Sequence, residues 1–132
     1  MATKFVPIDI ILVLHEDLLR KYGGSGGIRD RNLLESAIGQ PQATFRGKPL
    51  HRTLFDKAAA YAFHIARNHP FVDGNKRIAF VVMDIFLSRN GWDLVAKEED
   101  AYSMMMELAQ GRLTKTTLSA WLEKHSVKLR SA

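Results

Sequence analysis

The feature that most constrains the fold is the apolar segment IAFVVMDIFL, at residues 78–87. Wound into a helix, this segment is apolar on nearly every side, so it is stable only in the interior of a protein. It is far too short to span a bilayer, and it contains Asp84. The sequence therefore predicts a buried central helix from about Asn75 to Asn90, with the remainder of the chain packed around it.

Further segments have apolar residues at the three- and four-residue steps of an amphipathic helix. Capping and stop signals bound them: Pro7 opens the first, the GGSGG run at residues 23–27 ends it, Asp30 caps the second, and Thr53 with Asp56 forms a capping box for the third. The acidic run at residues 98–100 opens a fifth helix, and a sixth begins near Thr114. We therefore predict an all-α fold, a compact bundle of about six helices in one domain, residues 1–132.

The chain has 132 residues, 46% hydrophobic and 25% charged, the balance of a globular domain. It contains no cysteine, which excludes disulfides and thiolate metal sites and suits a reducing cytoplasm. No segment predicts a membrane span or a cleaved leader, so a cytoplasmic protein is expected. A formal charge of +5 is compatible with a nucleic acid, a nucleotide or an acidic protein as partner, and the scattered basic residues leave that choice open.

A polar cluster, NHPFVDGNKR at residues 68–77, leads into the central helix. Pro70 biases His69 away from the helical region, so the preceding helix is expected to end there. Phe71 and Val72 are expected to turn inward and anchor the loop. The other residues are unusually polar for a segment that adjoins the core, and their chemistry is the main question that the sequence raises.

Lys76 and Arg77 fall in the first turn of the central helix, where the helix dipole favours acidic side chains. The conflict disappears if an anion binds there, since free main-chain N–H groups, two cations and close approach at Gly74 together form a phosphate site. Asp73 adds a hard oxygen ligand of the kind that holds Mg²⁺ beside phosphates. His69 is the residue type best suited to general-base catalysis near neutral pH. The cluster thus predicts transfer of a phosphate-containing group to a hydroxyl.

Each of these residues also has a structural interpretation. Asp73 can be an N-cap, Asn75 a turn former, His69 a helix-end residue, and Lys76 and Arg77 solvated cations. Their occurrence together at one helix start favours a site over these separate explanations.

The segment HPFVDGNKR resembles the signature of the Fic/Doc superfamily, which reads His-Pro-Phe, two residues, Gly-Asn, one residue, Arg. Further segments resemble the death-on-curing (Doc) toxin branch: YGGSGGIRDRNLLESAIGQPQATF, AAAYAFHIARNHPFVDGNKR, FLSRNG and AQGRLT. The resemblance covers nearly the whole chain. It implies an all-helical Fic fold, ATP-dependent modification of a protein target, and the role of toxin in a toxin–antitoxin module.

The resemblance also implies a role for each matched residue. His69 corresponds to the catalytic base that deprotonates the target hydroxyl, and Asp73 corresponds to the ligand of Mg²⁺. Gly74, Asn75 and Arg77 correspond to the residues that hold the phosphates of ATP.

Lys76 departs from the broad pattern, since most Fic proteins have glycine there and transfer AMP. Doc-like proteins share the lysine, and they are understood to bind ATP in the reverse sense and to transfer its terminal phosphate. The resemblance thus favours an ATP-dependent protein Ser/Thr kinase, with Lys76 among the ATP-binding residues. Elongation factor Tu is the expected target, whose phosphorylation blocks translation. An AMP transferase is the alternative.

Residues 40–52 form a long connection that can be a small hairpin, and they match the position of the flap that docks the target in Fic proteins. The inhibitory sequence of many Fic proteins has only a poor match in SAWLEK, residues 119–124, which predicts core helix with Trp121 and Leu122 buried. Restraint is therefore expected from a separate protein, and the resemblance to Doc toxins implies a Phd-like antitoxin with a disordered tail.

Three other functions fit parts of the sequence less well. A nucleic-acid-binding module would use the positive charge but leave His69 and Asp73 without roles, so no direct nucleic-acid partner is expected. A metal-dependent hydrolase would need His64 and His69 to share a metal across a helix end, a poor spacing, with no second carboxylate near Asp73. A catalytically inactive binding module is the third alternative. The sequence leaves the oligomeric state open.

Overall fold

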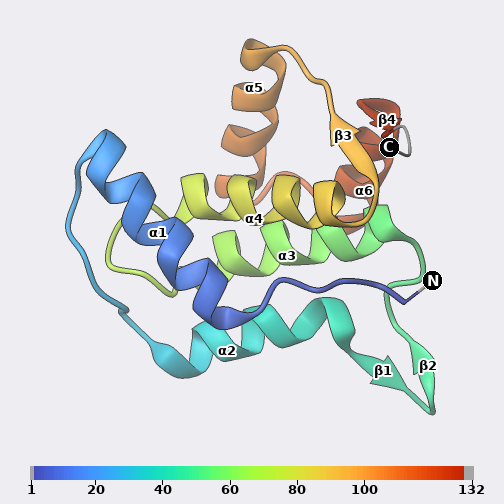
Figure 1. Ribbon diagram of the computed structural model, residues 1–132, viewed down its shortest axis with the longest axis horizontal. Helices are drawn as coiled ribbons and strands as arrows, with labels where there is room; N and C mark the ends of the chain where they lie inside the picture. Colours follow the sequence, from blue (N-terminus) through green and yellow to red (C-terminus); the bar gives the residue numbers. More distant parts are fainter. Residues whose placement is uncertain (1, 130–132) are drawn as a thin grey trace.

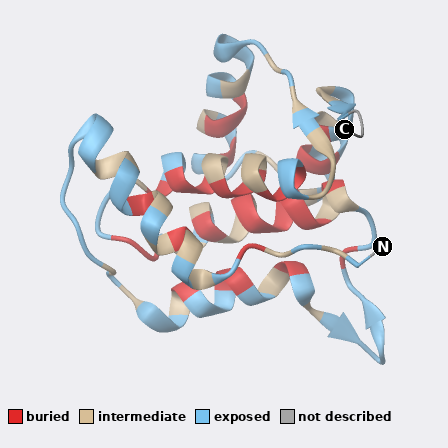
Figure 2. Cartoon of the chain, in the orientation of Figure 1, coloured by how far each residue is buried: buried red, intermediate tan, exposed pale blue. Residues whose placement is uncertain are grey.

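The centre of the fold is a pair of helices, α3 (Leu54–Asn68) and α4 (Asn75–Arg89), which lie side by side and run in opposite directions (Figure 1). The computed structural model describes residues 2–129 of the chain. Side chains along α4 are fully buried, among them Ile78, Val82 and Phe86. Buried residues gather on these two helices (Figure 2), which confirms the prediction of a buried central helix.

Further helices surround this pair: α1 (Ile8–Tyr22), α2 (Arg31–Gly39) with the short 3₁₀ helix η1 (Gln40–Gln42) after it, α5 (Glu98–Ala109) and α6 (Lys115–Lys124). In Figure 1, α1 crosses in front of the central pair, α2 lies below it, and α5 extends upward from it. The predicted all-α bundle is therefore confirmed.

The helices begin close to their predicted capping residues. Asp30 accepts a hydrogen bond from the main-chain N–H of Leu33 at 3.0 Å, and Thr53 forms the predicted capping box with Asp56. Pro7 stands one residue before α1 rather than at its first helical position, with φ −72° and ψ 159°. The proline ring fixes φ near this value in either position, so the sequence could not distinguish the two.

Residues 40–52 contain a hairpin, in which β1 (Thr44–Phe45) pairs antiparallel with β2 (Lys48–Pro49). The small hairpin that the sequence suggested is therefore present, and it extends away from the helices at the lower right of Figure 1. A second small sheet pairs β3 (Trp92–Leu94) with β4 (Ser126–Lys128). The segment after α4 is thereby tied to the segment after α6.

The prediction that α6 belongs to the core is confirmed in part. Leu122 is fully buried, but Trp121 is only partly buried, and its indole stacks on the imidazole of His125 with 4.1 Å between ring centroids. Ser119 donates a hydrogen bond to the carboxylate of Asp56 at 2.6 Å, which fixes α6 against the start of α3.

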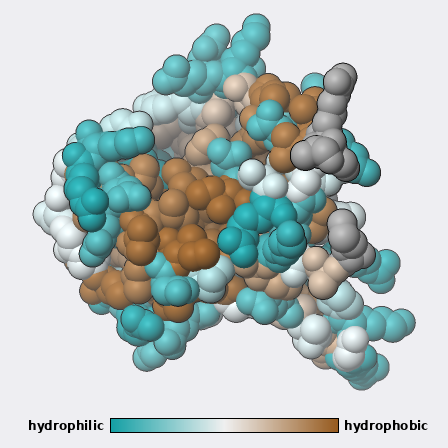
Figure 3. Space-filling view, in the orientation of Figure 1, coloured by the Kyte–Doolittle hydropathy of each residue, from teal (hydrophilic) through white to brown (hydrophobic). Residues whose placement is uncertain are grey.

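Hydrophobic surface gathers over the middle of the face seen in Figure 3, where α1 lies in front of the central helices. Several apolar side chains of α1 are only partly buried against the core. Within residues 2–129, no helix is both long enough and apolar enough to cross a membrane.

Candidate active site

The loop that joins α3 to α4, residues 69–74, carries the predicted site. α3 ends before His69, as Pro70 predicts, and His69 adopts the left-handed conformation with φ 51° and ψ 54°. This conformation costs a residue other than glycine about 1–3 kcal/mol, so surrounding contacts must hold it. The side chain of His69 is exposed to solvent, where it can meet a substrate.

Arg29 supplies contacts that hold His69, from the segment between α1 and α2. Its Nε donates to the carbonyl of His69 at 2.7 Å, and its Nη2 donates to the carbonyl of Asn68 at 2.8 Å. A cation is favoured at this C-terminal end of α3 by the helix dipole. The main-chain N–H groups of Arg29 and Asp30 also donate to the carbonyl of Pro70, at 2.7 and 3.0 Å. The loop is therefore fixed by a segment that lies far from it in the sequence.

The next two residues of the loop point in opposite directions. Phe71 is fully buried, as predicted, and forms an isolated antiparallel bridge with Ile28. Val72 is 50% exposed, so the prediction that it turns inward is wrong. Its N–H donates to the carbonyl of Gly27 at 3.1 Å, which continues the pairing of the two segments. Successive side chains of an extended segment alternate between its two sides, so only one of this pair can anchor the loop.

Asn75 closes the loop from the helix side. Its side chain is buried, its Oδ1 accepts from the N–H of Phe71, and its Nδ2 donates to the carbonyl of the same residue, both at 2.9 Å. The side-chain amide thus holds the loop, as the interpretation of a turn former suggested. The first main-chain bond of α4 runs from the N–H of Ile78 to the carbonyl of Gly74, so the N–H groups from Asn75 to Arg77 remain for a ligand at the helix N-terminus.

The carboxylate of Asp73 is held by main-chain N–H groups from two segments. Oδ1 accepts from Gly74 at 2.8 Å, and Oδ2 accepts from Ser25, in the GGSGG run, at 3.2 Å. Each oxygen retains lone pairs that can bind a metal. Gly24 makes room for this arrangement, because a Cβ at that position would lie 2.7 Å from Oδ2 of Asp73.

The N-terminus of α4 has no side-chain cap. Its N-cap residue is Gly74, with φ 77°, so the interpretation of Asp73 as the N-cap is wrong. The first turn contains no acidic residue and both predicted cations, Lys76 and Arg77. Free N–H groups, the positive end of the helix dipole and two cations together attract an anion.

The two cations contact different helices beside this N-terminus. Nζ of Lys76 lies 3.4 Å from the sulfur of Met106 on α5, and the guanidinium of Arg77 lies 4.4 Å from the centre of the Tyr22 ring at the end of α1. The ion pairs found among residues 2–129 all lie elsewhere. Both cations are exposed and remain available to a negatively charged ligand.

His64, the other histidine near the end of α3, faces away from this loop. Its Nε2 lies 3.1 Å from Nζ of Lys115 on α6, which also lies 3.3 Å from Nε2 of His51. Burial and the neighbouring Lys115 lower the pKa of His64 to about 4. In the part of the chain that the structure describes, no three His, Asp or Glu side chains are placed to hold a metal ion together, as a hydrolase with several protein ligands would need.

Two residues that contact the loop carry no signal in the local sequence. His15 on α1 lies with Nε2 2.7 Å from the carbonyl oxygen of Asp73, and Arg29 binds the end of α3. These contacts join residues 58 and 40 positions apart, which residue type alone does not reveal. The GGSGG run did carry a signal beyond a helix stop, since glycine permits close approach of the main chain to another group.

The fold and this loop place the chain in a known class. It belongs to the Fic/DOC family, whose sequence model matches residues 5–87. The chain is 43% identical over 90 residues to a protein named Toxin Doc from Mycolicibacterium smegmatis, a match covering 67% of this chain and 69% of that protein. It is 31% identical over 114 residues to a protein named Protein kinase doc from Escherichia phage P1, covering 86% of this chain and 89% of that protein.

The predicted resemblance to the Doc branch of this family is therefore confirmed. The family and its two similar members support a toxin of the Doc type and an enzyme of the transferase class. The phosphate donor, the target, the antitoxin and the roles of individual residues remain predictions.

Proposed function

We propose that this protein is a Doc-type kinase of a toxin–antitoxin module, which transfers the terminal phosphate of ATP to a hydroxyl group of a protein target. The proposed target is elongation factor Tu, whose phosphorylation would block translation, and a Phd-like antitoxin is the proposed restraint. The observation that carries this proposal is the N-terminus of α4, with uncapped N–H groups, no acidic residue and two cations, beside an oriented carboxylate.

The residues of the loop fit a phosphate group and a divalent cation. Free main-chain N–H groups in the first turn of α4, beginning with that of Asn75, would hold phosphates of ATP together with the side chain of Arg77, and Gly74 would permit their close approach. The carboxylate of Asp73 is exposed and oriented by two N–H groups, and one carboxylate suffices for Mg²⁺ that phosphates also bind. Mg²⁺, when bound, would neutralise phosphate charge.

His69 has the exposure that a general base toward a protein substrate requires. Its imidazole would accept the proton of the target hydroxyl while the hydroxyl oxygen bonds to the terminal phosphorus. The bond from that phosphorus to the bridging oxygen breaks in the same displacement, and ADP leaves. The backbone of His69, held by the guanidinium of Arg29, would fix the direction of the imidazole without burying it.

Lys76 supports transfer of the terminal phosphate rather than of AMP. Its side chain extends from the first turn of α4 to Met106 on α5, so it fills space that a glycine would leave open. Its ammonium group also adds positive charge beside the phosphates. The reverse orientation of ATP that Doc-like proteins are understood to use would bring the terminal phosphate to His69.

The hairpin of β1 and β2 is the proposed docking flap for the target. All four of its strand residues are exposed, so its main chain is accessible to an extended segment of another protein. Pro49 has no N–H to donate, which limits the number of hydrogen bonds that this edge can offer.

The test is incubation of the protein with Mg²⁺, purified elongation factor Tu and ATP labelled on either the γ- or the α-phosphate. His69→Ala is the inactive control, and His64→Gln is the matched control, since His64 lies in the helix that ends just before His69 but contacts Lys115. We expect label on the target only from γ-labelled ATP, lost in His69→Ala and retained in His64→Gln. Label from α-labelled ATP would establish an AMP transferase instead. Label from neither, in purified factor and in a translation extract, would contradict both activities.

A further inference from the structure

We propose that His15 is a positioning residue, which holds the peptide group between Asp73 and Gly74 so that its N–H is directed to the carboxylate of Asp73, in the proposed Mg²⁺ and ATP site. The inference rests on the proposed function, because it gives His15 a part in that site. His15 belongs to α1 and stands 58 residues before Asp73, outside every segment to which the sequence assigned a catalytic role.

His15 is a polar side chain in an apolar place. It is 3% exposed, and its imidazole stacks on the ring of Phe71 with 3.8 Å between centroids and 15° between planes. Removing such a group from water is unfavourable unless its polar atoms find partners. The partner of Nε2 is the carbonyl oxygen of Asp73, at 2.7 Å. A carbonyl oxygen only accepts, so Nε2 must carry the hydrogen and donate it.

This hydrogen bond fixes the direction of one peptide group. The carbonyl and the N–H of a trans peptide point in opposite directions, and no cis peptide bond occurs among residues 2–129. Because the carbonyl of Asp73 points to His15, the N–H of Gly74 points away from it, and the carboxylate of Asp73 accepts that N–H at 2.8 Å. The direction of this N–H therefore decides where the carboxylate of Asp73, the proposed ligand of Mg²⁺, is held.

The local sequence does not fix this direction. Gly74 has φ 77°, and glycine adopts positive and negative φ about equally readily, so the Asp73–Gly74 peptide group could rotate at little local cost. After such a rotation, the carbonyl oxygen would face the site, and its negative partial charge would repel a phosphate. The bond from His15 supplies the orientational preference that glycine lacks.

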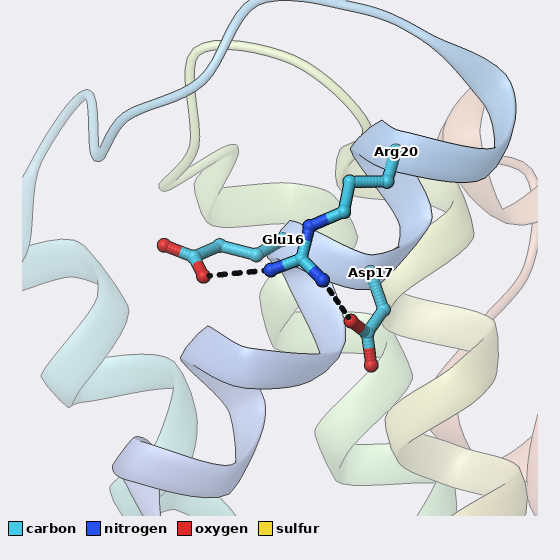
Figure 4. Close-up of polar contacts among 3 residues, drawn as sticks. All are labelled: Glu16, Asp17 and Arg20. Atoms are coloured by element: carbon cyan, nitrogen blue, oxygen red, sulfur yellow. Dashed lines mark hydrogen bonds and ion pairs between the residues drawn. The ribbon is translucent and has the colours of Figure 1, made fainter.

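α1 presents different residues to the loop and to solvent. His15 and Tyr22, two turns apart, both contact the site, the first at the loop and the second beneath a cation of α4. On another side of the helix, Arg20 forms exposed ion pairs with Glu16 and Asp17, at 3.6 and 3.4 Å (Figure 4). Exposed pairs of this kind contribute little to stability. Of the two contacts that α1 makes with the site, the one through His15 is made to the main chain of the loop.

The wild-type protein provides the first test. Long-range ¹⁵N–¹H NMR correlations of the His15 imidazole show which ring nitrogen carries hydrogen. We expect hydrogen on Nε2. An imidazole with hydrogen on Nδ1 alone would overturn the inference, because Nε2 could then not donate to Asp73, and this outcome depends on no variant that must fold.

Substitutions provide the second test. His15→Phe keeps a ring to stack on Phe71 but removes the donor, whereas His15→Gln keeps a donor. We expect KM for ATP to rise roughly tenfold in His15→Phe, as for the loss of one hydrogen bond to a charged group, with partial recovery in His15→Gln and a smaller change in kcat. Ile11→Val is the matched control, since Ile11 is fully buried on the same helix and the change removes only a methylene group.

The main-chain amide resonance of Gly74 separates this inference from the proposed function. Addition of Mg²⁺ with a non-hydrolysable ATP analogue should shift it in the wild type and in Ile11→Val, and much less in His15→Phe. A wild-type resonance that does not respond would overturn the ATP site and the role of His15 with it. An equal response in wild type and His15→Phe, with unchanged KM, would overturn the role of His15 alone.

Discussion

The two central helices, α3 and α4, begin in opposite ways. At the start of α3, Thr53 accepts from the N–H of Asp56 at 3.0 Å, and Asp56 accepts from the N–H of Thr53 at 3.3 Å. Ser119 on α6 donates to the same carboxylate at 2.6 Å. Burial alone would raise the pKa of Asp56, but the hydrogen bonds from Ser119 and Thr53 outweigh burial and lower it. The groups that complete this helix end belong to the chain itself.

The start of α4 has none of these groups. Its N-cap, Gly74, has no side chain, and its first turn contains Lys76 and Arg77 where α3 has an aspartate. Two cations at this position cost a few tenths of a kcal/mol each, which burial of the remaining helix readily offsets. The difference teaches that a helix N-terminus completed by its own chain serves the fold, whereas one left incomplete and surrounded by cations is suited to a ligand.

The largest loss of phosphate transfer is expected when an acidic residue is placed in the first turn of α4, as in α3. In Arg77→Glu, phosphate transfer should fall by about a hundredfold or more, because the substitution replaces a phosphate ligand with a repelling charge. The melting temperature should change little, since the helix dipole gains about 0.3–1 kcal/mol while the cation–π contact with Tyr22 loses about as much. Transfer of γ-label and a thermal melt measure the two quantities.

Arg89→Glu is the matched control, because it makes the same charge change in the last turn of the same helix. There the dipole favours the cation, so this variant should lose stability and retain transfer. If both variants lost activity equally, net charge rather than the helix N-terminus would be responsible, and the comparison of the two helix starts would fail.

A smaller effect is expected from crowding the carboxylate of Asp73. In Gly24→Ala, the added Cβ would stand 2.7 Å from Oδ2 of Asp73 and displace it, so Mg²⁺ affinity and transfer should fall by about 10–100-fold. Gly23→Ala controls for backbone strain, since Gly23 also has positive φ but has open space around its Cβ position. Isothermal titration with Mg²⁺ in the presence of a nucleotide would measure the difference. Equal losses in both variants would show that strain in the glycine run, and not contact with Asp73, is the cause.

The sequence predicted the start of α3 fully and that of α4 only in part. Thr53 and Asp56 are three residues apart, so the whole capping box can be recognised in a short segment of sequence. At α4, the two cations and the missing acid are equally local, and they indicated an anion site. The side chain of Asn75 could not be foreseen as the anchor of Phe71, because its role depends on how the loop folds back.

What the sequence could not show depends on contacts between distant segments. The expectation that Val72 turns inward treated it like its neighbour, but pairing with the segment around Gly27 imposes an alternation that only the folded loop reveals. The contacts of Arg29 and His15 with the loop were equally unpredictable, since nothing in the segment around either residue indicates them. Their partners are main-chain carbonyl groups, which leave no pattern of complementary residue types to recognise.

A pH-dependent effect is expected at α3, away from the loop. The pKa of His64 is about 4 in the folded protein, below the ordinary value of 6.5, because of burial and the neighbouring Lys115. The unfolded chain therefore binds more protons between these values, so stability is complete above pH 6.5 and is lost as the pH falls toward 4. Allowing for partial exposure, the loss is about 1–2 kcal/mol.

This acid sensitivity is measured by urea unfolding at pH 7 and pH 5, in wild type and in His64→Gln. The glutamine should remove the part of the loss that His64 causes, while His125→Gln, at the end of α6, leaves it in place. An unchanged loss in His64→Gln would assign the acid sensitivity to other groups.

The smallest effect is expected from removing the cap of α3. Thr53→Ala should lower the free energy of unfolding by about 1 kcal/mol, because the N–H of Asp56 loses its acceptor. KM for ATP should stay the same, since the chain's own residues complete this helix start and the proposed ATP site lies at α4. Thr53→Ser keeps the hydroxyl and should recover the stability. A rise in KM for ATP in Thr53→Ala that Thr53→Ser reverses would show that the capped end of α3 is coupled to the site at its other end, and the division between a structural and a functional helix start would then be too simple.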